Sequence, residues 1–333
     1  MTEKLTISGP ADLLAAVPHL LGTEPKESFV VLTLRAGILG ASLRMDAPAE
    51  AAPEDYAQMM TTYAAYDEKA TGSVLIIYTD EEPGSGYPYA AHVAALTNEL
   101  ATARMPARIV LLVTATHWAP YGTTDTNPLD EVRDSNANAT LTYFGSAPDL
   151  DAYNPAMLGT WAAPVHTPEG TDKDLDTARR TWAAALDGSD RAEGVTVQDT
   201  ETARRLAAAF QHRHIRDYLF RDTITTHNGS FEDVLMGTFT ARPDWDRIDR
   251  AEALAFELMK VVPAGQRAPM LTLMGWLQWL KGRGSQADRY LKLAAEDVTS
   301  FRLAVLLREV ITQGRVADVA RDPGKSYQRR IIQ

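Results

Sequence analysis

The amino-acid sequence predicts an α/β N-terminal domain, a mixed sheet with flanking helices, followed by an all-α C-terminal domain. Two nearly continuous apolar runs, Ser73–Thr79 and Ala107–Thr114, are typical of strands covered on both faces. A helical pattern lies between them, and this strand-helix-strand order implies parallel neighbours with a right-handed crossover. From Asp172 onward the apolar spacing is helical. Since 333 residues exceed the usual size of one domain, two compact units are expected.

The N-terminal elements follow in order from local signals. Pro10 supplies a first-turn proline to a helix that Gly22 ends. A β-branched run followed by Ala36-Gly37 predicts a tight hairpin, and Pro53 opens a second helix. The predicted elements are a helix at 10–21, strands at 28–35 and 38–44, a helix from 53, a strand at 73–79, a helix at 88–104 and a strand at 107–114.

The domain boundary is expected near Asp149. Regular patterning fades from Thr116 to that residue among Gly, Pro, Asn, Asp and Thr, which predicts a long loop or an irregular hairpin. The α/β domain is therefore assigned to 1–149 and the all-helical domain to 150–333. The expected helices of the second domain are Asp172–Leu186, Asp199–Arg221, Asp244–Val262, Pro269–Lys281, Ser285–Ala295 and Ser300–Thr312.

One helical hairpin in the second domain has the small-residue spacing of a tetratricopeptide-type repeat. Small side chains at Gly275, Gly282, Ala287 and Ala294 would let two antiparallel helices approach closely. The match extends to one repeat, and a solenoid needs neighbouring repeats to bury its faces. A packing role is therefore favoured over a peptide-binding groove, although both interpretations stay open.

Composition excludes several classes of protein. Carboxylates outnumber Lys and Arg by 44 to 33, for a formal net charge of -11, which disfavours a nucleic-acid partner. The absence of cysteine rules out disulfides, thiolate zinc sites and a cysteine nucleophile, and it favours a reducing compartment. No apolar stretch reaches the length of a membrane span. We expect a cytoplasmic protein that makes no contact with a membrane.

Two segments resemble a known family. They read LTISGPADLLAAVPHLLGTEPKESFVVLTL at Leu5–Leu34 and APMLTLMGWLQWLKGRGSQADRYLKLA at Ala268–Ala294. They resemble the start and the end of an actinobacterial family known as domain of unknown function 4192. The resemblance implies the fold and a bacterial or phage origin, and it implies no catalytic residues because the family has no assigned activity. Family members often carry a cysteine-containing patch after the strand that corresponds to Ala107–Thr114, where this chain has HWAPYGTTDTNPLDEVRD.

The candidate catalytic residues are Asp46, Asp80 and His117, each of which follows a predicted strand. If these strands run parallel, the three side chains share the edge of the sheet where ligands gather. Carboxylates beside an imidazole could hold a divalent metal or act as acid and base in hydrolysis. The favoured alternative is structural, with the acids capping turns and His117 paired with local backbone. We assign no metal ligands and no cofactor, since phosphate-loop, dinucleotide and zinc-protease motifs are absent.

The helix expected at Asp199–Arg221 is locally basic. Its arginines could contact a phosphate or RNA, but a solvated face paired with Asp217 and Asp222 is favoured. His212 and His214 point apart on a helix, so they could share a metal only if the segment is not helical.

Two functions are therefore carried forward. The first is a non-catalytic cytoplasmic interaction or regulatory protein whose helical half docks a protein partner that the sequence does not identify. The alternative is a metal-dependent hydrolase with its site at the strand carboxyl ends. Formation of a homo-oligomer is left open.

Overall fold

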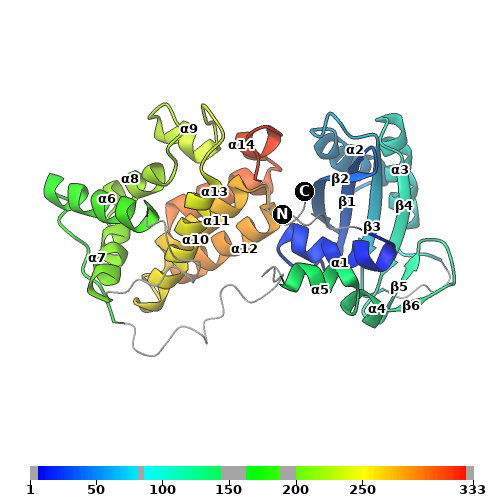
Figure 1. The fold of residues 1–333 in the computed structure, drawn as a ribbon, viewed down its shortest axis with the longest axis horizontal. Helices are drawn as coiled ribbons and strands as arrows, with labels where there is room; N and C mark the ends of the chain where they lie inside the picture. The colour runs from blue at the N-terminus through cyan, green and yellow to red at the C-terminus, as the bar shows by residue number, and fades with distance from the viewer. Residues whose placement is uncertain (1–6, 82–85, 144–162, 188–199, 328–333) are drawn as a thin grey trace. The chain divides into compact units, whose positions relative to one another are not determined.

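The computed structural model describes residues 7–81, 86–143, 163–187 and 200–327, which form an α/β unit and a helical unit (Figure 1). The division between the two compact units falls between Leu150 and Asp151. Because this point lies within 144–162, outside the described residues, the boundary at 149 stays a prediction. Among the described residues, no helix combines the length and apolar character needed to cross a membrane.

The described part of the α/β unit contains a six-stranded mixed sheet, which confirms this part of the predicted fold class. Its strands lie in the order β2-β1-β3-β4-β5-β6. They are β1 (Ser28–Arg35), β2 (Ile38–Asp46), β3 (Gly72–Tyr78), β4 (Ala107–Val113), β5 (His117–Pro120) and β6 (Asn127–Pro128).

The register of the sheet brings the ends of three strands to one edge. Ser28 of β1 pairs with Asp46 of β2 and with Tyr78 of β3, and both pairings are antiparallel. Tyr78 also pairs with Val113 of β4, in the parallel arrangement that the strand-helix-strand pattern predicts. The carboxyl ends of β2, β3 and β4 therefore lie at the same edge.

Helices cover both faces of this sheet (Figure 1). On one face Tyr56 and Leu96 pack with Phe29 of β1 in a buried cluster, and on the other Val17 packs with Ile76 of β3. The apolar runs are buried on both sides because each face has its own helical layer. The helices are α1 (Pro10–Leu21), α2 (Pro53–Ala64), α3 (Ala90–Thr102), α4 (Asp130–Arg133) and α5 (Asn136–Tyr143).

The segment after β4, expected to be a long loop or an irregular hairpin, contains more regular structure than that. Strands β5 and β6 form a short antiparallel pair, and helices α4 and α5 follow. The strands have four and two residues, and α4 has four. Elements this short carry no measurable period, so the pattern of the sequence does not reveal them.

A buried carboxylate fastens the connection after α2 to the β1-β2 hairpin. Asp67 accepts hydrogen bonds from the Thr33 hydroxyl, from Arg35 Nε at 2.8 Å and from the Ala41 amide at 3.4 Å. Burial raises the pKa of the Asp67 carboxyl, but the hydrogen bonds from Thr33 and Arg35 outweigh burial and hold this pKa below its ordinary value. Gly40 is required beside it, because a Cβ at that position would collide with the Asp67 carboxylate.

The described residues of the second unit form helices and connections without strands, in agreement with the predicted helical half. Its buried apolar core runs from Val165 to Val319. The helices are α6 (Asp172–Asp187), α7 (Thr200–Gln211), α8 (Arg213–Thr223), α9 (Phe231–Met236), α10 (Trp245–Lys260), α11 (Ala268–Leu280), α12 (Gly284–Asp297), α13 (Arg302–Thr312) and α14 (Asp318–Arg321).

The continuous helix predicted at Asp199–Arg221 is wrong, because His212 breaks it into α7 and α8. The backbone of His212 is extended, and its ring nitrogen Nδ1 accepts a hydrogen bond from the Ile215 amide at 3.5 Å. His212 is thus the N-cap of α8 rather than a residue on a helical face.

The close helix approach expected at Gly275 is present between α11 and α12. A Cβ at Gly275 would lie 2.8 Å from Leu291 Cγ and 3.1 Å from the Ala287 carbonyl oxygen. Every residue of α11 is buried, so this helix is the centre of the unit. The small residues therefore act in packing, while the likeness to a tetratricopeptide repeat stays a prediction.

Candidate functional site

The three candidate catalytic residues lie at one edge of the sheet but on different strands. Asp46 ends β2, Asp80 follows β3, and His117 begins β5. Asp46 and Asp80 belong to strands that are two positions apart in the sheet, and so do Asp80 and His117. Because neighbouring strands are about 4.8 Å apart, each of these two separations is about 10 Å. The edge is shared, but the fold does not converge these three side chains on one point.

Each of the three residues has partners of its own. Asp46 forms an ion pair of 2.7 Å with Arg44, and 83% of its side chain is exposed. The Asp80 backbone amide donates to Glu27 Oε1 at 2.6 Å. His117 Nδ1 lies 3.1 Å from the hydroxyl of Thr114. None of these three contacts is a carboxylate that caps a turn, so the structural interpretation stays a prediction.

Glu27 and Tyr89 are two residues of this edge that sequence reasoning missed. Both are non-glycine residues with positive φ, 38° and 58°. Glu27 Oε2 accepts from the Thr79 hydroxyl at 3.1 Å and from the Tyr89 hydroxyl at 3.4 Å. Burial is the main cause that raises the pKa of Tyr89, and the negative charge of Glu27 is the second. No motif marks these positions, since a left-handed conformation at Glu or Tyr has no sequence signal.

Among the described residues, no group of three or more His, Asp or Glu side chains lies close enough to hold a metal ion. At this edge the Glu27 carboxylate accepts hydrogen bonds from the Thr79 hydroxyl and the Asp80 amide. The residues in this region fit a hydrogen-bonded sheet edge.

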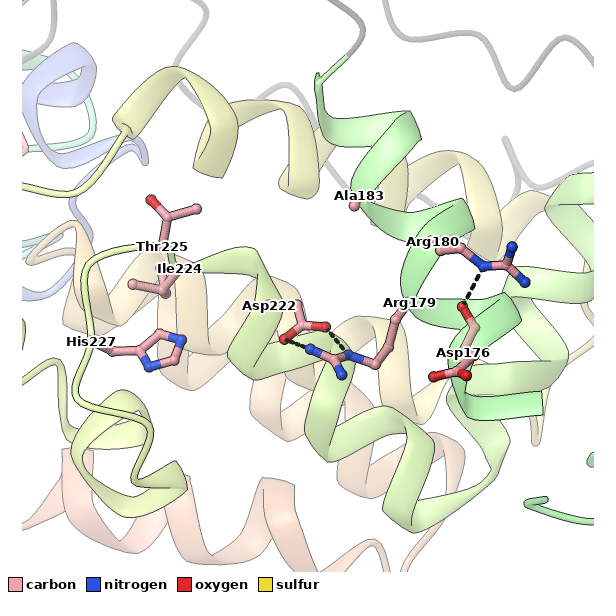
Figure 2. Close-up of a pocket in the computed structure, with 8 residues that line it drawn as sticks. All are labelled: Asp176, Arg179, Arg180, Ala183, Asp222, Ile224, Thr225 and His227. Atoms are coloured by element: carbon pink, nitrogen blue, oxygen red, sulfur yellow. Dashed lines mark hydrogen bonds and ion pairs between the residues drawn. The ribbon is translucent and has the colours of Figure 1, made fainter. Parts of the chain in front are cut away.

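A groove in the helical unit brings charged side chains of distant segments together (Figure 2). Its volume is about 840 Å³, and it lies among α6, α8 and the segment that follows α8. We call it the α6-α8 groove. Its lining residues are Asp176, Arg179, Arg180, Ala183, Asp222, Ile224, Thr225 and His227.

The groove exists because α6 has two different faces. Ala178, Trp182 and Leu186 recur at a helical spacing and are buried in the core of the unit. The Trp182 indole nitrogen donates a buried hydrogen bond of 3.1 Å to the Thr223 hydroxyl at the end of α8. This bond and the packing around it fix α6 against α8, so the charged face of α6 lines the groove.

A bidentate ion pair crosses the floor of the groove. Arg179 Nε and Nη2 donate to the two oxygens of Asp222 at 2.5 and 3.1 Å (Figure 2). The Asp222 side chain is largely buried, whereas Arg179 is 38% exposed. The hydrogen bond to Asp222 raises the pKa of Arg179 further above its ordinary value, so this guanidinium stays charged. The Arg179 guanidinium is thus ordered and partly exposed, and its charge is balanced by Asp222.

Two arginines stack on the ring of Tyr218 beside the groove. Arg221 lies 4.3 Å and Arg179 5.1 Å from the ring centroid. His214 makes an edge contact with the same ring at 5.0 Å. The stacking limits the rotamers of both arginines.

The two ends of the groove carry different polar groups (Figure 2). Arg180 is exposed, its Nε donates to the Asp176 carbonyl oxygen at 3.3 Å, and it has no ion-pair partner among the described residues. At the other end His227 accepts from the Gly229 amide through Nδ1 at 2.9 Å. Burial and the charge of Arg221 lower the pKa of His227. Its ring is therefore neutral near pH 7, with the proton on Nε2.

Local sequence signals account for only part of this site. The basic helix with Asp217 and Asp222 nearby predicts a paired, solvated face. The structure contains the Arg216–Asp217 pair at 2.7 Å, but Arg216 is buried rather than solvated. Arg179 is 43 positions from Asp222 in the sequence, and no local pattern links the two residues. Ordered donors and carboxylates without a convergent metal site form a surface that is suited to binding.

The described residues thus define a two-unit protein, an α/β sheet unit followed by a helical unit with a charged groove. The sequence profile of the family described as Domain of unknown function (DUF4192) matches residues 10–316. The chain belongs to this family, which confirms the resemblance of its two terminal segments. No curated protein and no solved structure matches the chain.

Proposed function

We propose that this chain is a non-catalytic cytoplasmic interaction or regulatory protein of bacterial or phage origin whose helical unit docks a protein partner. The observation that carries the proposal is the α6-α8 groove, where an ordered Arg179–Asp222 pair and an exposed Arg180 lie along one open surface. The lack of cysteine supports the cytoplasmic location.

The composition of the groove supports a protein partner. Arginine and tyrosine are enriched at the centres of protein interfaces because they combine large contact areas with directional donors. Arg179, Arg221 and Tyr218 form such a group, and cation–π stacking orders them before binding. A small-molecule site is usually enclosed and mostly apolar, whereas this groove is open and lined by charges.

The charges of the groove indicate the chemistry of the partner. The Arg180 guanidinium, which forms no ion pair with a described residue, can bind an acidic side chain, and the exposed Asp176 can accept a backbone amide. The neutral His227 adds a donor at the opposite end. We infer a partner segment that carries an Asp or Glu side chain and lies along α6.

The alternative metal-dependent hydrolase has weaker support. Its residues Asp46, Asp80 and His117 occupy separated positions along the sheet edge, and Asp46 is paired with Arg44.

Charge reversal tests the docking proposal. The tagged full chain is used to capture proteins from a lysate of the organism that encodes it, as wild type and as Arg180→Glu. We expect the substitution to reduce the recovery of a stoichiometric partner about tenfold, the effect of losing one interfacial hot spot. Arg205→Glu is the matched control, because Arg205 is an exposed arginine on α7 and does not line the groove.

Each outcome of this capture experiment supports or contradicts docking at the α6-α8 groove. Loss of the partner with Arg180→Glu and its retention with Arg205→Glu supports docking at the groove. A partner that both variants retain equally places docking elsewhere and contradicts the proposal. Recovery of no partner by the wild-type chain contradicts the interaction role itself.

A further inference from the structure

A stripe of four exposed residues, Arg302, Val305, Leu306 and Glu309, lies on the outer face of α13. The helix packs on α12 and α11 through the buried Ala304 and Leu307. On its opposite side Val305 and Leu306 are 42% and 45% exposed, and they are two of the few large apolar side chains in the described residues with such exposure. A terminal helix in a row of packed helices normally presents a polar outer face to water.

The charges that flank this apolar pair are opposite in sign. Arg302 precedes the pair by three residues and Glu309 follows it by three, and both are exposed. The four positions recur at i, i+3, i+4 and i+7, so they lie on one face of α13. Neither Arg302 nor Glu309 has an ion-pair partner among the described residues. The two charges therefore remain available to a molecule that covers the apolar pair.

We propose that a second copy of this chain covers the stripe, with the two α13 helices antiparallel about a two-fold axis between Val305 and Leu306. In this arrangement each Val305 faces the Leu306 of the other copy. Because Arg302 and Glu309 are equally distant from the axis, each Arg302 then faces the other copy's Glu309. Both the apolar positions and the charged positions of the stripe are therefore self-complementary, as an isologous interface requires.

The size of the helix sets the strength of this dimer. An 11-residue helix is about 16 Å long, so one helix pair buries less surface than a permanent dimer requires. We therefore expect a dimer that dissociates on dilution. Its contact residues do not overlap the α6-α8 groove, so the two proposals stand or fall separately.

Sedimentation velocity of the full chain over a concentration series tests the dimer. We expect Arg302→Glu alone, and Glu309→Arg alone, each to raise the dissociation constant about tenfold, because symmetry turns both ion pairs into repulsive contacts. The double variant restores the opposite charges across the axis and should return the dissociation constant to near the wild-type value. Circular dichroism checks that all variants keep their helix content.

Two results would overturn this inference. The first is a wild-type chain that sediments as a monomer at every concentration. The second is a dimer whose dissociation constant the single reversals leave unchanged, since the copies then meet at another surface. Leu306→Asp provides an independent check, because it should abolish the dimer by placing a carboxylate at the centre of the apolar pair.

Discussion

Asp67 shows how one buried residue stabilises the α/β unit. Its carboxylate joins β1 to the chain after α2, and its side chain is 1% exposed. The pKa of the folded Asp67 carboxyl lies below its ordinary value because hydrogen bonds from Thr33 and Arg35 outweigh its burial. The folded state thus holds the Asp67 proton less tightly than the unfolded state. The stabilisation is present above the unfolded pKa of about 3.9 and is lost as pH falls towards the folded pKa.

We predict that Asp67→Asn lowers the free energy of unfolding of the α/β unit at pH 7 by about 1–3 kcal/mol, because the charged acceptor of Thr33 and Arg35 is removed. The variant should also lose less stability than the wild type as pH falls below about 4. Urea unfolding at several pH values measures both effects.

The neighbouring Glu68→Gln is the matched control for this substitution. Glu68 is exposed and adjacent in sequence, so its change should leave the unfolding free energy within about 0.5 kcal/mol of wild type. Equal effects of the two substitutions would contradict the role assigned to Asp67.

At the residue scale the sequence predicted little of the candidate site. Strand-end residues such as Asp80 could be placed at a sheet edge because topology and strand ends have local signals. The pairing of Arg179 with Asp222 has no such signal, since it depends on how α6 packs on α8. Long-range contacts between charged side chains follow from tertiary packing and leave no period in the sequence.

The packing of α11 on α12 depends on a position without a side chain, Gly275. We predict that Gly275→Val lowers the free energy of unfolding of the helical unit by about 1–3 kcal/mol, because the new Cβ would lie 2.8 Å from Leu291 Cγ. The partner atom belongs to the fully buried Leu291, and the backbone oxygen of Ala287 is 3.1 Å away. Thermal or urea unfolding measures this loss.

Gly284→Ala is the control at the start of α12. A Cβ there has no heavy atom within 4 Å, so the change should be neutral or stabilise the helix by up to about 1 kcal/mol. If Gly275→Val behaved in the same way, the helices would not be in the close contact described.

At the element scale the sequence was most informative where apolar spacing is long and regular. Strands β3 and β4 and helices α10 to α13 lie within a few residues of their predicted ranges. The break at His212 was missed because apolar residues continue at helical spacing on both sides of it, at Phe210 and Ile215. The N-cap of α8 is made by an imidazole, which is not one of the usual capping side chains.

The whole molecule has separate cores in its two units. The buried clusters of the α/β unit lie between Leu13 and Trp118, and the cluster of the helical unit lies between Val165 and Val319. Because the residues of each core come from one stretch of chain, we expect each unit to fold independently. The fading of pattern after Thr116 predicts a boundary at 149, which lies outside the described residues.

We predict two unfolding transitions in scanning calorimetry of the full chain. Asp67→Asn should lower the temperature of one transition and Gly275→Val that of the other, because the two residues belong to different cores. Fragments 1–149 and 150–333 should each show one of these transitions. A single transition that both substitutions shift equally would mean that the units unfold as one.

The most direct test of the central claim, that a protein partner docks in the α6-α8 groove, is site-specific crosslinking. A photo-crosslinking amino acid replaces Ala183, which lines the groove, or Lys292, an exposed residue of α12, in the full chain exposed to lysate. The account predicts one crosslinked protein of stoichiometric yield from position 183 and none from position 292. Equal crosslinking at both positions, or none at 183 while a partner is still captured, would contradict it.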